Sequence, residues 1–323
     1  MNSTRSRTDD DVLRQRVSEL EGRSGHVRAL AWSPGGVKLA AGGAGDEILV
    51  HDVERGGGTA AKASGLRGHA GQVEQLRFDP ARQGGDRVLS VSADKTAKVW
   101  DVRSGKCAST IDVKEAGYTA CWSPSGKHLA VGTTDTVFVV DAATMAVVWE
   151  QKFKFDVNAM IWNASGKIFM MATGEGKMEK FSFDETTGAL TPSSTHFAHN
   201  GGCYCIDMDP TGKFFAMGAA DAIVSLWESS TDICYDTVVR LDYPIRTLSY
   251  SHDSAYLASA SEDLFVDIAD VKTGECVAQI KTEVPTNAVA FHPKELVLAF
   301  AGEDKKGTVR LWSAVQAFSM GSK

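Results

Sequence analysis

The fold is decided by a short motif whose first copy is Ala31-Trp32-Ser33-Pro34. The motif reads apolar residue, large apolar or aromatic residue, small polar residue, and often Pro. Six further copies follow along the chain: Arg77-Phe78-Asp79-Pro80, Cys121-Trp122-Ser123-Pro124, Ile161-Trp162-Asn163-Ala164, Asp207-Met208-Asp209-Pro210, Ser249-Tyr250-Ser251-His252 and Ala290-Phe291-His292-Pro293. The second residues of successive copies are 46, 44, 40, 46, 42 and 41 positions apart. A repeat of this length indicates an array of similar units, each able to form one four-stranded blade.

Seven such units predict an all-β chain folded as a seven-bladed β-propeller of the WD40 type. Each copy of the motif is expected to end one strand and to begin a turn. Further strands are expected at Lys38–Gly42, Thr96–Asp101, His128–Gly132, Ala222–Trp227 and Thr308–Trp312. Two near-identical segments, residues 101–107 and 270–276, each carry a Gly turn into a fourth strand.

The ring must be closed by the start of the chain. The last blade obtains three strands from about Thr286 to Trp312, so its fourth strand is expected near Arg16–Leu20. An unpaired sheet edge would remain otherwise. The pattern over Asp9–Leu20 also fits a short amphipathic helix, and the strand is the favoured interpretation. We therefore assign one propeller domain to residues 15–313, with disordered tails at 1–14 and 314–323.

Composition and charge narrow the function classes. The chain has 323 residues, of which 43% are hydrophobic and 23% charged, and its net charge is −7. This charge argues against a protein that binds nucleic acid over its whole surface. No run of about 18 apolar residues is present, so no membrane span is expected. We also expect no cofactor, no metal and no small-molecule substrate, because no catalytic or ligand-binding motif is recognisable.

The six cysteines have no metal-site spacing: Cys107, Cys121, Cys203, Cys205, Cys234 and Cys276. We expect them to be small core residues in a reducing compartment. Cys203 and Cys205 alternate with Tyr204, which is typical of a strand.

One blade carries the polar signature of WD repeats. Trp100-Asp101 is the only literal Trp-Asp pair in the chain. The same blade contains His69, Ser90 and Asp94, and in WD proteins these residue types form a buried hydrogen-bonded relay with the tryptophan. His69 and Asp94 could also be interpreted as a catalytic pair. The structural relay is favoured because buried polar groups need partners, and we assign no catalytic residue.

Several carboxylates are candidate site residues. Glu262, Asp263 and Asp267 lie within six residues, but strand geometry sends alternate side chains to opposite faces. They therefore predict a tight turn and a solvated face. Asp207 and Asp209 are expected at a strand end, where Asp-Pro opens a turn.

The central and later blades have a more specific pattern. It is carried by residues 151–163, 209–227, 240–253 and 257–269. Together these stretches resemble THO complex subunit 3, the WD-repeat family within the THO part of the TREX mRNA-export machinery. The resemblance covers about Ser24–Trp312. It implies a nuclear scaffold subunit without enzyme activity, whose partners are other THO/TREX proteins and which contacts RNA at most weakly or indirectly. Two loops depart from the family pattern, Glu54–Gly65 and Asp184–His196.

The run Lys152-Phe153-Lys154-Phe155 is the first candidate contact segment. Aromatic rings beside lysines could stack on RNA bases. In the favoured arrangement, Phe153, Phe155 and Val157 share a buried face while Lys152 and Lys154 point into water. A contact with a protein partner is the second interpretation, and direct RNA binding is the third.

The second candidate is the segment Arg240–Arg246, which joins blade five to blade six. Loops between blades line one face of a propeller, and Tyr and Arg are typical interface residues. Tyr243 and Arg246 are therefore candidate partner contacts. Alternatively, Tyr243 packs between blades and Arg246 pairs with an acid such as Asp242.

Two other functions remain open. One is a peptide reader or adaptor of another nuclear pathway, such as chromatin or a ubiquitin ligase, and a deep acidic central pocket would favour it. The other is a propeller enzyme, which would require converging carboxylates or a metal in the central channel.

Overall fold

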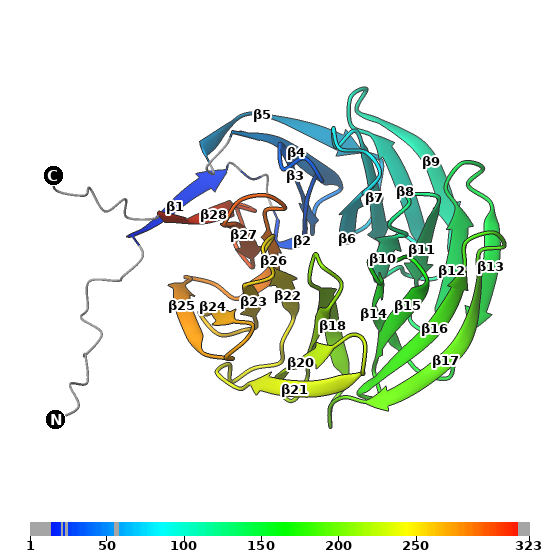
Figure 1. The fold of residues 1–323 in the computed structure, drawn as a ribbon. Coiled ribbons are helices and arrows are strands. Elements are labelled where there is room, and N and C mark those ends of the chain that lie inside the picture. Colours follow the sequence, from blue (N-terminus) through cyan, green and yellow to red (C-terminus); the bar gives the residue numbers. More distant parts are fainter. Residues whose placement is uncertain (1–13, 21, 23–24, 55–57, 316–323) are drawn as a thin grey trace, which may run out of the picture.

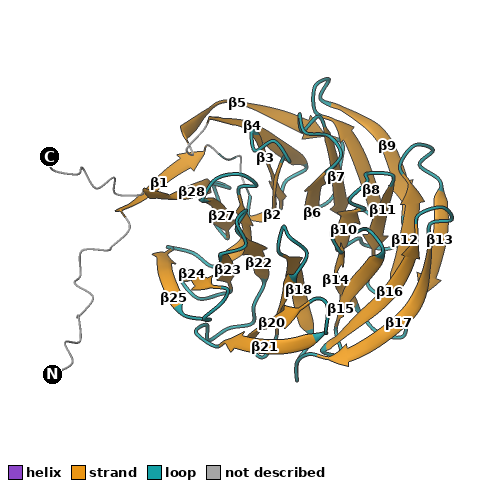
Figure 2. Cartoon of the chain, in the orientation of Figure 1, coloured by secondary structure: helices purple, strands orange, loops and turns teal. Residues whose placement is uncertain are grey.

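Seven four-stranded antiparallel sheets are arranged as blades in a closed ring (Figure 1). The computed structural model describes residues 14–20, 22, 25–54 and 58–315. Within these ranges every regular element is a strand, and no helix occurs (Figure 2). The predicted all-β, seven-bladed propeller is thus confirmed.

Six of the seven blades use four consecutive strands, ordered from the channel outward, and blade seven takes its outermost strand from the start of the described chain. Blade one contains β2 (Val27–Trp32), β3 (Lys38–Gly43), β4 (Glu47–Glu54) and β5 (Gly58–Arg67). Blade two contains β6 (Val73–Phe78), β7 (Arg87–Ser92), β8 (Thr96–Asp101) and β9 (Lys106–Asp112). Blade three contains β10 (Thr119–Trp122), β11 (His128–Gly132), β12 (Thr136–Asp141) and β13 (Val147–Lys152). Blade four contains β14 (Val157–Trp162), β15 (Ile168–Thr173), β16 (Lys177–Asp184) and β17 (Ala189–Phe197).

The remaining three blades follow the same order. Blade five contains β18 (Cys203–Met208), β19 (Phe214–Ala219), β20 (Val224–Glu228) and β21 (Ile233–Val238). Blade six contains β22 (Thr247–Tyr250), β23 (Tyr256–Ala260), β24 (Phe265–Asp270) and β25 (Cys276–Lys281). Blade seven contains β26 (Thr286–Phe291), β27 (Val297–Gly302), β28 (Val309–Val315) and β1 (Arg14–Leu20).

The repeated motif marks the end of the innermost strand in all seven blades. Its large residue is the last residue of that strand, as with Trp122 in β10. Its small polar residue then organises the turn, because the hydroxyl oxygen of Ser123 accepts a hydrogen bond from the backbone N–H of His128 at 3.1 Å. Gly126 completes this turn with a φ of 68°, which favours glycine. The motif is therefore a strand end followed by a capped turn.

The ring closes through the strand predicted near the start of the chain. β1 pairs antiparallel with β28, and Leu20 lies opposite Val309. Both side chains are buried in the same core cluster. The strand interpretation is confirmed, and the helical alternative does not hold for residues 14–20. The two strands extend to Arg14 and Val315, slightly beyond the predicted limits of 15 and 313; the rest of both predicted tails lies outside the described residues.

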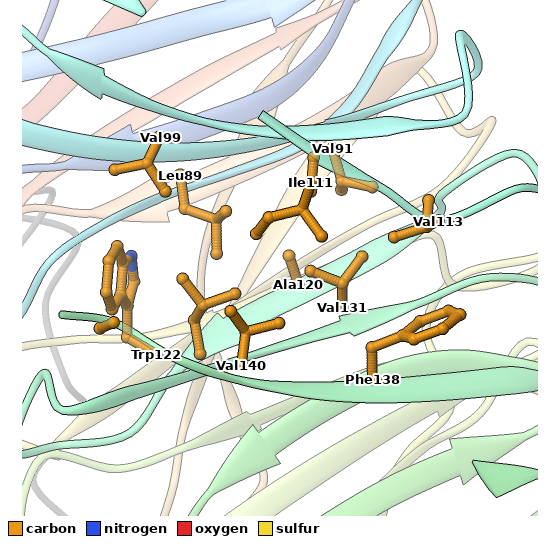
Figure 3. Packing of buried hydrophobic residues seen from close by; sticks show 13 residues of the cluster. Leu89, Val91, Val99, Ile111, Val113, Ala120, Trp122, Val131, Phe138 and Val140 are labelled. Atoms are coloured by element: carbon orange, nitrogen blue, oxygen red, sulfur yellow. The ribbon is translucent and has the colours of Figure 1, made fainter. Parts of the chain in front are cut away.

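The core consists of apolar layers between neighbouring blades. Figure 3 shows the layer between blades two and three, in which side chains from the two sheets face one another. Its labelled members are Leu89, Val91, Val99, Ile111, Val113, Ala120, Trp122, Val131, Phe138 and Val140. Because each blade is covered on both sides, its middle strands read as nearly continuous apolar runs.

The two segments predicted as loops are mostly outer strands. Within 54–65, Glu54 ends β4 and residues 58–65 belong to β5; within 184–196, Asp184 ends β16 and residues 189–196 belong to β17. Their composition misled the prediction because an outermost strand has one side in water and does not need the apolar residues of inner strands.

The prediction for the cysteines was wrong at three positions. Cys107, Cys234 and Cys276 are exposed, each within the first two residues of an outermost strand. Cys203 and Cys205 lie on β18 as predicted, but the pairing register shifts between them. As a result Cys203 packs toward blade four and Cys205 toward blade six.

Candidate functional site: the channel mouth and its bordering loops

All connections between consecutive blades lie on one face of the ring, which we call the mouth face. This follows from the topology, because four antiparallel strands return the chain to the face from which it entered. Both candidate segments from the sequence are such connections. Residues 153–156 join blade three to blade four, and residues 239–246 join blade five to blade six.

A hollow of about 410 Å³ opens where the innermost strands reach the mouth face. It continues between these strands as a narrower cavity of about 200 Å³. The hollow is lined by Arg28, Glu74, Tyr204, Pro244, Arg246, Glu262 and Asn287. The loop 239–246 therefore forms part of the channel mouth.

The two arginines of the mouth are paired with acids. Arg28 lies 3.8 Å from a carboxylate oxygen of Glu74. Arg246 donates a hydrogen bond to Glu262 and another, of 3.1 Å, to Asn287, and it lies 3.9 Å from Glu303. The alternative in which Arg246 pairs with an acid is therefore confirmed, with Glu262 rather than Asp242 as the partner. The mouth is a mixed, largely neutralised surface rather than a deep acidic pocket.

The loop 239–246 is held against the next blade by Asp263. One carboxylate oxygen of Asp263 accepts hydrogen bonds from the backbone N–H of Asp242 at 2.9 Å and from the backbone N–H of Tyr243 at 3.3 Å. The same oxygen accepts the hydroxyl of Ser261 at 2.7 Å. Tyr243 is half exposed, so the alternative in which it packs between blades is wrong; Ile245 fills that core instead.

Asp267 corrects another expectation. It was assigned to a solvated face, but its side chain is fully buried. The guanidinium of Arg240 donates to its two oxygens at 2.9 and 2.6 Å, and this bond raises the pKa of Arg240. Strand alternation points Asp267 into the space between blades, where a buried carboxylate requires a cation. The pair ties the start of the loop 239–246 to β24.

Asp207 and Asp209 sit at the end of β18, as predicted for a strand end, but their surroundings differ. Burial raises the pKa of Asp207 to about 6, against the attraction of the Arg77 cation and the hydrogen bond from the Tyr250 backbone N–H at 2.8 Å. Asp209 accepts hydrogen bonds within the following turn, from the backbone N–H groups of Thr211 and Phe214. Both carboxylates thus connect structural elements.

The segment from Lys152 to Phe155 lies in the favoured arrangement. The rings of Phe153 and Phe155 stack with centroids 5.1 Å apart and pack against the apolar layer between blades three and four. Lys152 and Lys154 are exposed, and Lys152 is 3.0 Å from Asp135. No aromatic face of this segment stands free beside both lysines, and a partner contact at Lys152 and Lys154 stays a prediction.

The polar residues of blade two come together. The two ring nitrogens of His69 lie 2.7 Å from Asp94 and 2.7 Å from the hydroxyl of Ser90, and the indole N–H of Trp100 donates to the same hydroxyl at 2.8 Å. Burial lowers the pKa of His69. Burial opposes ionisation of Asp94, but hydrogen bonds from Thr96, Ala70 and His69 outweigh it and lower its pKa to about 2.

The geometry of Ser90, His69 and Asp94 resembles a nucleophile, base and orienting acid. Ser90 is fully buried, and its hydroxyl is held between His69 and the Trp100 indole. A substrate carbonyl has no route to this oxygen in the structure. The arrangement instead connects the loop before blade two to strands β7 and β8.

A second relay in blade five escaped the sequence analysis. His199 lies 3.2 Å from Asp221 and 2.8 Å from the hydroxyl of Ser225, and the indole of Trp227 donates to that hydroxyl at 2.7 Å. Ser225 is on the third strand of its blade, whereas Ser90 is on the second. The sequence contains variants of the two WD signature pairs in this blade, Ala198-His199 and Trp227-Glu228. The relay was still missed, because its serine is not on the strand where the WD pattern places it.

Two further searches covered only the part of the chain that the structure describes. No group of three or more His, Cys, Asp or Glu side chains there could hold a metal ion. No helix in the same residues has the length and apolar character needed to cross a membrane.

Comparisons with known proteins agree with this architecture. Residues 14–52, 62–101 and 190–228 match the family model "WD domain, G-beta repeat". The crystal structure of the Cps50 (Swd1) β-propeller domain from Myceliophteria thermophila superposes with a TM-score of 0.78, covering 93% of this chain and 100% of that chain. Its sequence identity is 19%, so this likeness concerns the fold alone.

Two relatives are similar in sequence. WD repeat-containing protein AAC3 of Dictyostelium discoideum is 29% identical over 74% of this chain, and the match covers 50% of that protein. THO complex subunit 3 of Arabidopsis thaliana is 39% identical over 89% of this chain and 90% of that protein. Because the second match extends over nearly the whole of both proteins, this chain belongs to the THO complex subunit 3 family of WD-repeat proteins.

Proposed function

We propose that this chain is a non-enzymatic scaffold subunit of the THO complex, which couples transcription to mRNA processing and export in the nucleus. The observation that carries this proposal is the 39% identity to a THO complex subunit over 89% of the chain. Its partners are other THO/TREX proteins. The chain acts without a cofactor, membrane or small-molecule substrate.

The geometry supports a scaffold role through rigidity. A ring closed by β1 and β28 leaves no blade free to separate, and the polar contacts described above hold the loops of the mouth face in place. A surface that is ordered before binding loses little conformational entropy on assembly. In this proposal His69, Ser90, Asp94 and Trp100 are structural residues, because their hydrogen bonds hold one such loop.

RNA contributes at most an indirect or weak contact. The net charge of −7 disfavours the phosphate backbone, and Asp135 already pairs with Lys152. Lys152→Glu combined with Lys154→Glu should therefore change the affinity for single-stranded RNA by less than about threefold. A larger loss, measured by fluorescence anisotropy at fixed salt, would show that RNA binds this segment directly.

The proposed function is tested by affinity purification from nuclear extract with mass spectrometry. The tagged chain should recover the other THO subunits, whereas an unrelated WD-repeat propeller with the same tag should not. Recovery of chromatin or ubiquitin-ligase components without THO subunits would instead identify a reader or adaptor of another nuclear pathway.

A further inference from the structure

We propose that one patch on the mouth face docks a basic, apolar segment of a THO partner. The patch consists of Val239, Asp242, Tyr243, Glu262, Leu264 and Glu283, and we call it the acidic–apolar patch. The inference rests on the proposed function and adds to it the location and the chemistry of a partner contact.

The apolar members of the patch are unusually exposed for such residues. Val239 is 65%, Tyr243 50% and Leu264 53% exposed. They come from two elements that the structure joins, because Asp263, next to Leu264, accepts the backbone N–H of Tyr243. A group of exposed apolar side chains on joined elements marks an interaction surface, whereas single ones need no explanation. Tyrosine in particular is enriched at protein interfaces.

The third element of the patch is joined in the same way. The backbone N–H of Thr282 donates to the carbonyl of Leu264 at 2.9 Å. This bond places Glu283 beside the turn that carries Leu264. The patch is therefore one continuous surface built from the loop 239–246, the turn 261–264 and the chain after β25.

The loop that carries Tyr243 is fixed at both ends. Arg240 is bound to buried Asp267 near its start, and the backbone N–H of Ile245 donates to Ala219 at 3.0 Å near its end. Such bonds order the loop before a partner arrives, so binding does not have to immobilise it. This rigidity distinguishes the patch from a surface loop that is merely exposed.

The charge of the patch selects the partner's chemistry. Apart from the Arg240–Asp267 pair, the loop 239–246, the turn 261–264 and residues 281–285 carry the carboxylates Asp242, Glu262, Asp263 and Glu283 but only two cations, Arg246 and Lys281. Arg246 is already bound to Glu262. Within the described residues, Asp242 and Glu283 have no ion-pair partner, so both carboxylates are open to a cation. A segment with apolar side chains and Lys or Arg complements this surface.

Charge reversal tests the patch without disturbing its core. Asp242 uses only its backbone N–H to bind Asp263, and both Asp242 and Glu283 are exposed. Asp242→Lys combined with Glu283→Lys should lower the recovery of THO subunits from nuclear extract about tenfold or more, while the melting temperature stays close to that of the parent. The matched control is Glu115→Lys with Asp156→Lys, two exposed acids of other mouth-face loops, which should retain recovery.

Two short amphipathic peptides test the chemistry directly, one of Leu and Lys and the other of Leu and Glu. The Leu–Lys peptide should bind the parent protein about tenfold more tightly than the Leu–Glu peptide. The charge-reversed variant should remove this preference, and Tyr243→Ala should weaken the binding of the Leu–Lys peptide. Equal binding of both peptides, or THO recovery unchanged by the charge reversal, would overturn the proposal. The latter outcome leaves the proposed function intact, whereas failure of the parent chain to recover any THO subunit refutes that function itself.

Discussion

The junction between blades two and three differs from the junction between blades five and six in how polar groups are used. The first is an apolar layer in which Leu89, Val131 and their neighbours interdigitate (Figure 3). The second also has an apolar layer, but it adds an ion pair between the partly exposed Arg240 and the buried Asp267. Only the second junction carries a loop that forms part of the channel mouth.

The difference shows that the two junctions perform different tasks. Apolar layers supply stability in proportion to the area that they bury. A buried ion pair adds little net stability, because desolvation of the two charges offsets their attraction. Its directional hydrogen bonds instead fix a position. We therefore interpret the apolar layer as the source of ring stability and the ion pair as the device that positions the loop 239–246.

The largest effect is expected from a cavity in the apolar layer. Leu89 is fully buried, so Leu89→Ala should lower the free energy of unfolding by about 4 kcal/mol. Urea denaturation measures this change, and Val148→Ala at an exposed position of blade three is the control. A loss below about 1 kcal/mol would show that the layer can collapse around the missing side chain.

The ion pair gives the next largest effect. Asp267→Ala leaves Arg240 without its partner and should lower the free energy of unfolding by about 3 kcal/mol. Replacing both residues, Arg240→Met with Asp267→Leu, should restore most of that stability. The double variant should nevertheless recover fewer THO subunits, because the loop is no longer held. Full recovery of these subunits by a stable double variant would contradict the positioning role.

The two histidine relays should differ in a smaller way. Ser90→Ala leaves two buried groups without a partner and should cost about 2 kcal/mol. Ser225→Ala should cost about 1 kcal/mol, since the His199–Ser225 bond that it removes is only partly buried, whereas the His69–Ser90 bond is buried. Equal losses in parallel denaturation experiments would mean that this difference in burial has no consequence.

Acid should affect the buried histidines and the buried carboxyl group of Asp207 with opposite sign. Burial lowers the pKa of His69 and His128, so the unfolded chain takes up protons first as the pH falls below about 6.5, and stability decreases. Burial raises the pKa of Asp207 to about 6, so the folded chain takes up this proton first, and stability increases as the pH falls from about 6 toward 4.

Asp207→Asn removes the second contribution only. The melting temperature of this variant should therefore fall more steeply than that of the parent between pH 6.5 and 5. Calorimetry at several pH values provides the measurement. Parallel curves for the two proteins would show that Asp207 does not titrate in this range.

Much of the fold and part of the candidate site could be predicted from the local sequence. The motif that contains Trp122 and its six further copies located every innermost strand, because a strand end and a polar capping residue are adjacent in each copy. His69, Ser90, Asp94 and Trp100 could be grouped because their types match a known WD pattern. The relay of blade five was missed because Ser225 occupies another strand.

Contacts between blades could not be derived in this way. Nothing near Asp267 in the sequence shows that Arg240, on the connection from the preceding blade, lies against it. Two partners of Arg246 are equally remote, since Asn287 and Glu303 belong to the next blade. The bulge at Cys203 is also a property of the paired strands rather than of the residues alone.

The sequence by itself determined the number of blades, the strand ends and the closing strand, because these depend on periodicity and on local turn chemistry. Only the tertiary structure decided which polar side chains pair between blades, which carboxylates are buried and which apolar side chains remain exposed at the mouth. The physical reason is that burial and pairing depend on the approach of residues from neighbouring blades. Such residues are distant along the chain, and their separation is set by packing of the whole ring.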